Sequence, residues 1–245
     1  MPDSSQVTPY KDVHTSKKKQ VTSMFDGIAP YYDFLNRFLS LGIDVIWRKK
    51  AIKQLQNVRH NTILDVATGT ADLAIEAALS LKPLKINGLD ISKEMLRLGD
   101  KKIEDKNLTS VITLEHGDSE NLPYQSDTFD VAMSAYGVRN FENLIAGLKE
   151  MYRVIQPGGT IMVLEFSKPK VFPLKQFFGI YFKYLLPLIG RIKSRDPKAY
   201  SYLYESVQVF PDYHQFTAKL EEAGFKQTKF IPLTGGICTI YLGTK

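Results

Sequence analysis

The chain has 245 residues, 44% hydrophobic and 24% charged, which suits one large α/β domain with local additions. The formal net charge of +6 would favour anionic lipid or nucleic acid. The basic excess is concentrated in the short runs 17–19, 48–50 and 191–195, and no arginine-rich tract with interleaved aromatic residues is present. Nucleic acid is therefore a minor alternative, and we expect no nucleic-acid partner.

Cysteine and histidine usage limits the chemistry further. Cys238 is the only cysteine, which excludes an internal disulfide and any multi-cysteine metal site. The four histidines are scattered without ligand spacing, so we expect no metal. A reducing, cytoplasmic compartment is predicted. The first twenty residues fit neither a secretory signal nor a transit peptide, and residues 1–17 are predicted to form a disordered arm.

The segment 18–58 is predicted to be helical. Apolar residues recur with helical spacing from Lys18 up to Pro30, where we expect the helix to be interrupted, and a second helix is expected around 44–55. This aromatic-rich segment either lies over a ligand site as an N-terminal lid or packs on the edge of the sheet.

Strand and helix patterns then alternate. Strands are expected at 62–68, 85–91, 111–117, 129–136 and 160–166, with helices at 72–81, 93–105 and about 141–155. Ser92 should begin the second of these helices, and the stretch 157–159 should end the third. A helix over 211–222 and closing strands at 225–233 and 238–244 follow. The pattern predicts an α/β fold with a doubly wound, seven-stranded, mostly parallel sheet.

The alternation is interrupted after the fifth strand. Residues 171–192 are rich in Phe, Tyr and Leu and are about as long as a membrane span, but Lys175, Lys183, Pro173 and Pro187 break the run. We expect a helical insertion over 168–205 that covers an apolar substrate pocket or touches a membrane surface. Packing on its own domain is the alternative.

The stretch 65–72 (DVATGTAD) falls between the first strand and its helix, where a ligand-binding turn is expected. Gly69 allows the backbone to approach a ligand closely, and the following helix offers unpaired N–H groups. A phosphate-binding fingerprint needs three glycines, and this stretch has one. Asp65 and Asp72 would repel a pyrophosphate but suit cationic groups, such as the amino group and sulfonium of S-adenosylmethionine.

Two further acids follow neighbouring strands. Asp90 lies about 20 residues beyond Thr70, where a second parallel strand presents an acid to a ribose hydroxyl pair. Asp118, with Ser119 beside it, ends the third strand and could accept from an adenine amino group; the alternative is a turn residue. Asp130 opens a strand, so a structural role is expected.

Together these pieces resemble a known family. One set of features resembles, in its order along the chain, class I S-adenosylmethionine-dependent methyltransferases: the turn 65–72, Asp90 and the stretches 117–118, 122–124, 129–130 and 157–159. A second set of stretches resembles the C-methyltransferases of menaquinone and ubiquinone biosynthesis: 24–36, 47–48, 136–140, 164–169, 200–206 and 235–237. The resemblance runs from about residue 18 to the end.

The resemblance implies a Rossmann-like methyltransferase domain with S-adenosylmethionine as methyl donor. It implies methylation of a carbon of a demethylated isoprenoid quinol, with demethylmenaquinol as the expected substrate. A ubiquinone-pathway benzoquinol or another lipophilic small molecule is the alternative. By position, Thr70, Asp90, Asp118 and Ser119 match the family's cofactor contacts. Ala135 departs from the pattern, because ubiquinone-type members often have a serine there.

A sulfonium methyl group is already activated, so the enzyme must mainly align it and exclude water. A quinol carbon becomes nucleophilic when a ring hydroxyl, titrating near pH ~10, loses its proton. Arg139 and Asn140 are the candidates for holding this phenolate or an activating water, as the resemblance also suggests. Tyr136 and Tyr200 are weaker candidates for contacting the ring. Arg139 could instead cap the helix expected from Phe141.

Two other classes remain as rivals. A nicotinamide oxidoreductase would use the same kind of sheet, but the missing glycines argue against it. A non-enzymatic membrane-associated binding protein is favoured only by the apolar stretch 171–192. Peripheral contact with the inner face of the membrane and a homodimer are left open by the sequence.

Overall fold

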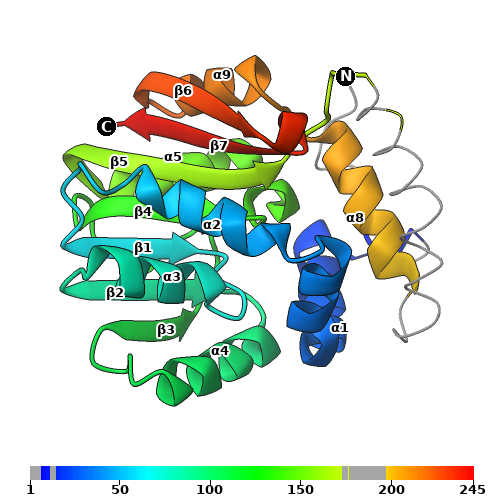
Figure 1. The fold of residues 1–245 in the computed structure, drawn as a ribbon, viewed down its shortest axis with the longest axis horizontal. Helices are drawn as coiled ribbons and strands as arrows, with labels where there is room; N and C mark the ends of the chain where they lie inside the picture. The colour runs from blue at the N-terminus through cyan, green and yellow to red at the C-terminus, as the bar shows by residue number, and fades with distance from the viewer. Residues whose placement is uncertain (1–6, 12–14, 173–175, 177–196) are drawn as a thin grey trace.

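The computed structural model describes residues 7–11, 15–172, 176 and 197–245. They form one seven-stranded sheet in the order β3-β2-β1-β4-β5-β7-β6 (Figure 1). The strands are β1 Thr62–Val66, β2 Lys85–Asp90, β3 Ile112–His116, β4 Phe129–Ala135, β5 Ile155–Phe166, β6 Lys226–Leu233 and β7 Cys238–Thr244. Strands β1 to β5 pair in parallel, and β7 runs antiparallel to both β5 and β6. The predicted doubly wound, mostly parallel sheet is confirmed.

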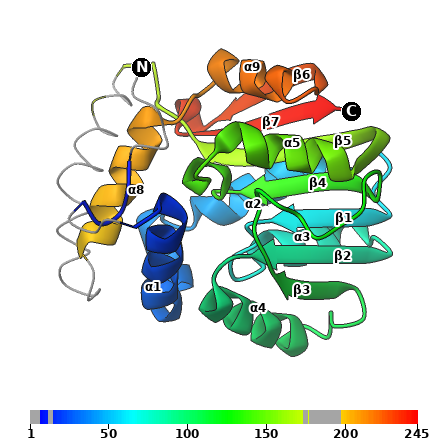
Figure 2. The ribbon, with the colours of Figure 1, turned by 180° about the vertical axis from the view of Figure 1, so that it is seen from behind.

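Helices cover both faces of the sheet (Figures 1 and 2). The α2 helix (Ile43–Lys53) and the α3 helix (Asp72–Leu81) lie on one face, and α5 (Leu144–Val154) and α9 (His214–Glu222) lie on the other. Because both faces are covered, the central strands are almost continuously buried, as β4 is from Phe129 to Ser134. The α4 helix (Lys93–Asp105) follows β2 and begins at Ser92, whose hydroxyl accepts from the Met95 N–H, as predicted.

Two helices lie off the sheet, beyond the carboxyl ends of the parallel strands: α1 (Lys17–Leu39) and α8 (Pro197–Val209) (Figure 1). The α1 helix contributes Lys18, Val21 and Phe25 to the wall of a pocket at this end of the sheet, and its role as a lid stays a prediction. The α2 helix is packed into the core against the sheet by Trp47, Ala51 and Ile52. The two helices of the 18–58 segment therefore take different positions, and α2 packs on a face of the sheet rather than on its edge.

The predicted interruption at Pro30 is wrong, since α1 continues through it. Proline lacks the N–H for one helical bond, which favours a break. Side-chain contacts hold the helix on both sides of Pro30: Asp26 accepts from the Ser92 hydroxyl, and Asp33 accepts from the Thr70 hydroxyl. Tertiary contacts outweigh the local preference here.

The helix predicted over about 141–155 ends close to the expected residue, but the role predicted for 157–159 as its stop is wrong. The helix ends at Val154, and Pro157, Gly158 and Gly159 lie inside β5, which begins earlier than the expected residue 160. Gly158 has φ 78°, and a Cβ at Gly159 would lie 2.6 Å from the Asp130 carbonyl oxygen. The small residues thus serve a close approach of β5 to β4 rather than a helix end.

Some predictions lie outside the described residues. Most of the apolar stretch 171–192 and residues 1–6 and 12–14 of the arm are among them. Within the arm, Val7 and Tyr10 pack against a cluster formed by α1 and α8. No helix in the part of the chain that the structure describes is long and apolar enough to cross a membrane.

Candidate functional site

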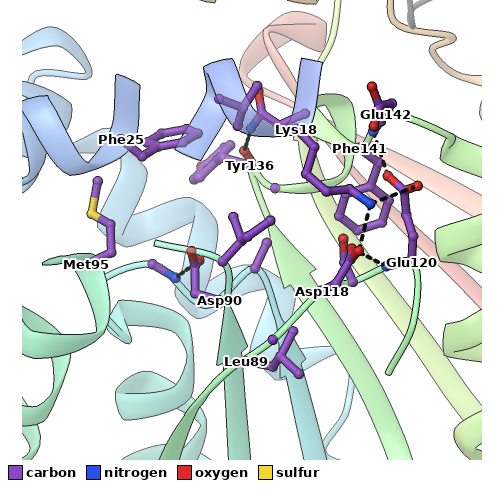
Figure 3. A pocket seen from close by; sticks show the side chains of 18 of the residues that line it. Lys18, Phe25, Leu89, Asp90, Met95, Asp118, Glu120, Tyr136, Phe141 and Glu142 are labelled. Carbon is purple, nitrogen blue, oxygen red and sulfur yellow. Dashed lines mark hydrogen bonds and ion pairs between the residues drawn. The ribbon is translucent and has the colours of Figure 1, made fainter. Parts of the chain in front are cut away.

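A pocket lies where the carboxyl ends of β1 to β4 meet α1 (Figure 3). The empty space between the lining residues is about 670 Å³, a figure that includes the open solvent at the mouth of the pocket. Its lining comes from α1, from the turns after β1 and β2, and from the segments after β3 and β4: Lys18, Val21, Phe25, Tyr32, Ala67, Gly69, Leu89, Asp90, Ile91, Met95, Gly117, Asp118, Ser119, Glu120, Ala135, Tyr136, Gly137, Asn140, Phe141 and Glu142. Gly69, Asp90, Asp118, Ser119 and Asn140, all predicted site residues, are thus brought together.

The turn after β1 has an unusual backbone. Ala67, Gly69 and Ala71 all have positive φ, at 55°, 58° and 64°. Only glycine adopts this region without steric cost, so the two alanines store strain that the surrounding fold must hold. The predicted ligand turn is therefore a locally strained, fixed structure at the base of the pocket.

Asp90 is anchored at the end of β2. Its carboxylate accepts from the Gly69 N–H and from the Ser92 N–H, each at 2.8 Å. Burial raises the pKa of Asp90 above its ordinary value, although these two N–H groups oppose that shift. Each carboxylate oxygen has a second lone pair. Asp90 is therefore oriented by the backbone while retaining acceptor capacity toward the pocket.

Asp118 faces a cation from the lid. The Lys18 Nζ lies 2.6 Å from Asp118 Oδ2 and 3.5 Å from Glu120 Oε2 (Figure 3). The other Asp118 oxygen accepts from the Glu120 N–H, as a turn residue does. Burial lowers the pKa of Lys18, but the two carboxylates outweigh it and raise the pKa overall. Asp118 thus combines the predicted pocket position with the turn geometry given as its alternative.

The charges that line the pocket are mostly negative. Lys18 is the cation of the lining, and the carboxylates are those of Asp90, Asp118, Glu120 and Glu142. Such an excess of carboxylates attracts a cationic ligand and repels a pyrophosphate. The residues present therefore fit S-adenosylmethionine better than a dinucleotide.

Two predicted cofactor residues behave differently from the rest. Asp65 and Thr70 do not line the pocket. Asp65 is fully buried, accepts from the Thr68 hydroxyl at 2.6 Å and has its pKa raised to about 7 by burial. The Thr70 hydroxyl donates to Asp33 at 2.6 Å and accepts from Lys102 at 3.0 Å. Both residues build the turn, and their contact with a cofactor stays a prediction.

Asp72, expected to act on a cationic ligand, is already paired. Its carboxylate lies against Lys102 and 3.1 Å from Arg48. Arg48 also pairs with Asp44 at 2.8 Å. These ion pairs join α2, α3 and α4, so the charge of Asp72 is compensated within the protein.

Arg139 and Asn140 lie in the 3₁₀ turn η2 (Val138–Asn140), which follows β4. The Arg139 side chain is buried, and its Nη1 lies 2.7 Å from the Glu165 carboxylate. The alternative role of capping α5 is wrong, because Asn143 supplies that cap. Arg139 does not line the pocket, whereas Asn140 does. The Arg139 Nε–H is buried and has no hydrogen-bond partner among the described residues.

Tyr136 is the aromatic residue that the end of β4 contributes to the pocket wall. Its ring lies 4.8 Å from that of Phe166, centroid to centroid, and Phe166 in turn meets Trp47 of α2 edge-on at 6.2 Å. Trp47 donates its indole N–H to the Thr234 hydroxyl at 2.9 Å.

The side chain of Tyr200, the other ring candidate, is outside the described residues.

Metal binding was not expected from the sequence. Within residues 7–11, 15–172, 176 and 197–245, no group of three or more His, Cys, Asp or Glu side chains is arranged to hold a metal ion.

The sheet order with an antiparallel β7 and the pocket at the strand ends define the fold of S-adenosylmethionine-dependent methyltransferases. A solved S-adenosylmethionine-dependent methyltransferase from Thermotoga maritima matches with a TM-score of 0.65, covering 91% of this chain and 99% of its own, at 19% identity.

Relatives of known name match over nearly the whole length. Residues 13–245 match the model of the ubiE/COQ5 methyltransferase family. The demethylmenaquinone methyltransferase of Bacteroides fragilis is 44% identical, over 98% of this chain and 97% of its own. The ubiquinone/menaquinone biosynthesis C-methyltransferase UbiE of Geotalea daltonii is also 44% identical, over 94% and 98%. The chain belongs to the ubiE/COQ5 methyltransferase family, and it is a methyltransferase.

Sequence reasoning gave no role to several residues that the structure places at the site. Lys18 and Asp33 reach the predicted cofactor residues from α1, and Glu165 and Tyr202 contact Arg139 and Asn140. Glu165 and Tyr202 lie in stretches that carry the family resemblance, which is the only signal that pointed to them. No sequence pattern pairs residues so far apart.

Proposed function

We propose that this protein is an S-adenosylmethionine-dependent C-methyltransferase that converts demethylmenaquinol to menaquinol, the last step of menaquinone biosynthesis. The observation that carries the proposal is the acidic pocket whose Asp90 is oriented by the Gly69 and Ser92 N–H groups. Relatives named for demethylmenaquinone support the choice of substrate. S-adenosylmethionine, when bound, supplies an activated methyl group.

Each pocket residue has a defined task in this proposal. Asp90 accepts from the ribose hydroxyls, and Asp118, with Ser119 beside it, accepts from the adenine amino group. Gly69 lets the backbone approach the ligand. The α1 helix contributes Lys18, Val21, Phe25 and Tyr32 to the wall of the pocket, where with both ligands bound it would limit the access of water.

The catalytic task falls to Asn140 and Arg139. Asn140 lines the pocket, so its amide N–H is the direct donor to the oxygen of the ionising quinol. Arg139 acts from behind it, where its unpartnered Nε–H suits a buried water molecule that reaches the same oxygen. Hydrogen bonds to the phenolate lower the proton affinity of a hydroxyl that otherwise titrates near pH ~10.

The test separates cofactor binding from turnover. Asp90→Asn should weaken S-adenosylmethionine binding about 10- to 100-fold, measured by calorimetry, because a charged acceptor is lost. Asn140→Ala and Arg139→Ala should each lower kcat strongly, by about 10²- to 10³-fold for a donor lost at a developing negative charge, with cofactor affinity nearly unchanged. Asp100→Asn, at an exposed position of α4, is the control. An Asp90→Asn enzyme with unchanged affinity would remove Asp90 from the site.

Product analysis decides the substrate. The purified enzyme should methylate a demethylated naphthoquinol with a short isoprenoid tail, and mass spectrometry of the product should show one added methyl group. Preferential methylation of a demethylated benzoquinol, or no transfer to either, would contradict the proposal.

We further propose that the enzyme works in the cytoplasm at the inner face of the membrane that holds its lipophilic substrate. Large apolar side chains support this, with Leu41 83% and Phe172 78% exposed. A homodimer is the other way to cover such side chains. Co-sedimentation with liposomes tests membrane binding, and sedimentation velocity tests dimer formation. A protein that is monomeric and does not bind liposomes would contradict both.

A further inference from the structure

The side-chain amide of Asn140 is held from two sides. Its Oδ1 accepts from the Tyr202 hydroxyl at 3.1 Å, and its Nδ2 donates to the Tyr136 carbonyl oxygen at 3.3 Å. The two ends of an amide have opposite hydrogen-bonding roles, so a flip would exchange the donor and the acceptor that the residue presents. What fixes the amide therefore decides whether Asn140 offers a donor or an acceptor to the pocket.

Tyr202 is suited to fix it. Its side chain is only 3% exposed and packs in a cluster with Val21 and Met24 of α1 and with Ala199 of α8. Burial raises the pKa of the Tyr202 hydroxyl well above its ordinary value, so this group keeps its proton across the working range of pH. The Tyr136 carbonyl oxygen can only accept, so it requires the Nδ2 end of the amide, and the Tyr202 hydroxyl completes the arrangement by donating to Oδ1.

The Nδ2 end of the Asn140 amide then faces the Tyr136 carbonyl oxygen and the pocket. One Nδ2 hydrogen is used by the Tyr136 carbonyl oxygen. An amide nitrogen carries two hydrogens. Because Asn140 lines the pocket, the second hydrogen is available to a ligand oxygen.

We propose that Tyr202 is a positioning residue for methyl transfer: its hydroxyl, together with the Tyr136 carbonyl oxygen, holds the Asn140 amide so that an N–H, and not the carbonyl, meets the quinol oxygen. This inference rests on the proposed function. It also links the lid to the chemistry, because the Tyr202 ring packs on α1 while its hydroxyl reaches η2.

Tyr202→Phe tests the role, because it keeps the buried ring and removes only the hydroxyl. The assay measures kcat and KM with a short-tailed demethylated naphthoquinol, the Kd for S-adenosylmethionine, and Tm. We expect kcat to fall about 10- to 100-fold, the loss typical of a misplaced reacting group, while the cofactor Kd stays within about twofold. Tyr204→Phe, on the same helix, is the matched control.

A double-mutant cycle separates positioning from simple support of the fold. If Tyr202 acts through Asn140, then Tyr202→Phe combined with Asn140→Ala should be no slower than Asn140→Ala alone, within about threefold. A structural role would instead lower Tm and slow both backgrounds by the same factor.

Each outcome has one meaning. Suppose that the wild type transfers methyl to the quinol. Unchanged kcat in Tyr202→Phe, or a loss that multiplies with the loss in Asn140→Ala, then overturns the inference and leaves the proposed function intact. A wild-type enzyme that transfers no methyl to the quinol contradicts the proposed function, and the inference with it.

Discussion

The sheet and the lid layer are stabilised in different ways. In the sheet, side chains such as Ile63 and Met133 are fully buried, and the two strands that carry them pair directly with each other. The α1 helix buries Val21 and Met24 in a small apolar cluster and adds polar contacts from Lys18 to Asp118, Asp26 to Ser92, and Asp33 to Thr70. The partly exposed ion pair of Lys18 with Asp118 contributes about 0–1 kcal/mol. The predicted cofactor acids thus lie on a buried framework, beneath a helix that is held in part by exposed contacts.

The largest expected effect is in the framework. Glu165→Ala would leave the buried Arg139 guanidinium without its counter-ion, and losing one partner of a buried pair costs about 3–5 kcal/mol. Urea denaturation should show this loss in the free energy of unfolding. The double variant Arg139→Met with Glu165→Leu should be more stable than Glu165→Ala, because it leaves no buried charge. Equal stability of Glu165→Ala and wild type would show that the framework tolerates an unpaired cation.

A pH-dependent effect should come from Asp65. Its folded-state pKa is raised from 3.8 to about 7, so between these values the folded protein keeps a proton that the unfolded chain has released. The free energy of unfolding should therefore fall as pH rises across this window, by at most about 4 kcal/mol, and level off above it.

Asp65→Asn removes this titration. Its stability relative to wild type should rise as pH increases from about 4 to about 7, as measured by denaturant unfolding at a series of pH values. Asp105→Asn, at an exposed position of α4, is the charge-matched control. Parallel pH profiles of wild type and Asp65→Asn would contradict a raised pKa at this residue.

Substitution of a glycine by alanine should change stability in opposite directions in the sheet region and in α1, with smaller effects than those above. A Cβ at Gly137 would lie 2.6 Å from the Ala67 Cβ and 2.8 Å from the Ser134 hydroxyl, so Gly137→Ala should cost about 1–3 kcal/mol. A Cβ at Gly27 in α1 would meet nothing within 4 Å, and Gly27→Ala should gain about 0.5–1 kcal/mol from helix propensity. Thermal unfolding of both variants provides the comparison. A destabilised Gly27→Ala would mean that the lid is packed as tightly as the framework.

The smallest effect should come from the lid contact at Asp118. Lys18→Met frees the Asp118 carboxylate from its ion pair, and the Kd for S-adenosylmethionine should fall by a few-fold at most, the scale of a partly exposed pair. Lys19→Met, at the exposed neighbouring position, should leave the Kd unchanged. Weaker binding in Lys18→Met would show that the lysine holds the cofactor site together.

The sequence predicted local features better than distant contacts. Helical spacing predicted α3 and α4 with their observed ends, and the acids after the strands converge because parallel strands end at one edge. The hydrogen bond from Thr70 to Asp33 and the ion pair of Arg139 with Glu165 join residues far apart in the chain. No periodicity reports such contacts, and the same contacts explain why Pro30 fails to end α1.

The position of Trp47 has a practical consequence. It is the only tryptophan in the chain, and its indole touches Phe166, which stacks on Tyr136 in the pocket wall. All intrinsic indole fluorescence therefore originates two aromatic rings away from the pocket. Emission from the unlabelled protein offers a direct optical signal for titrating quinols.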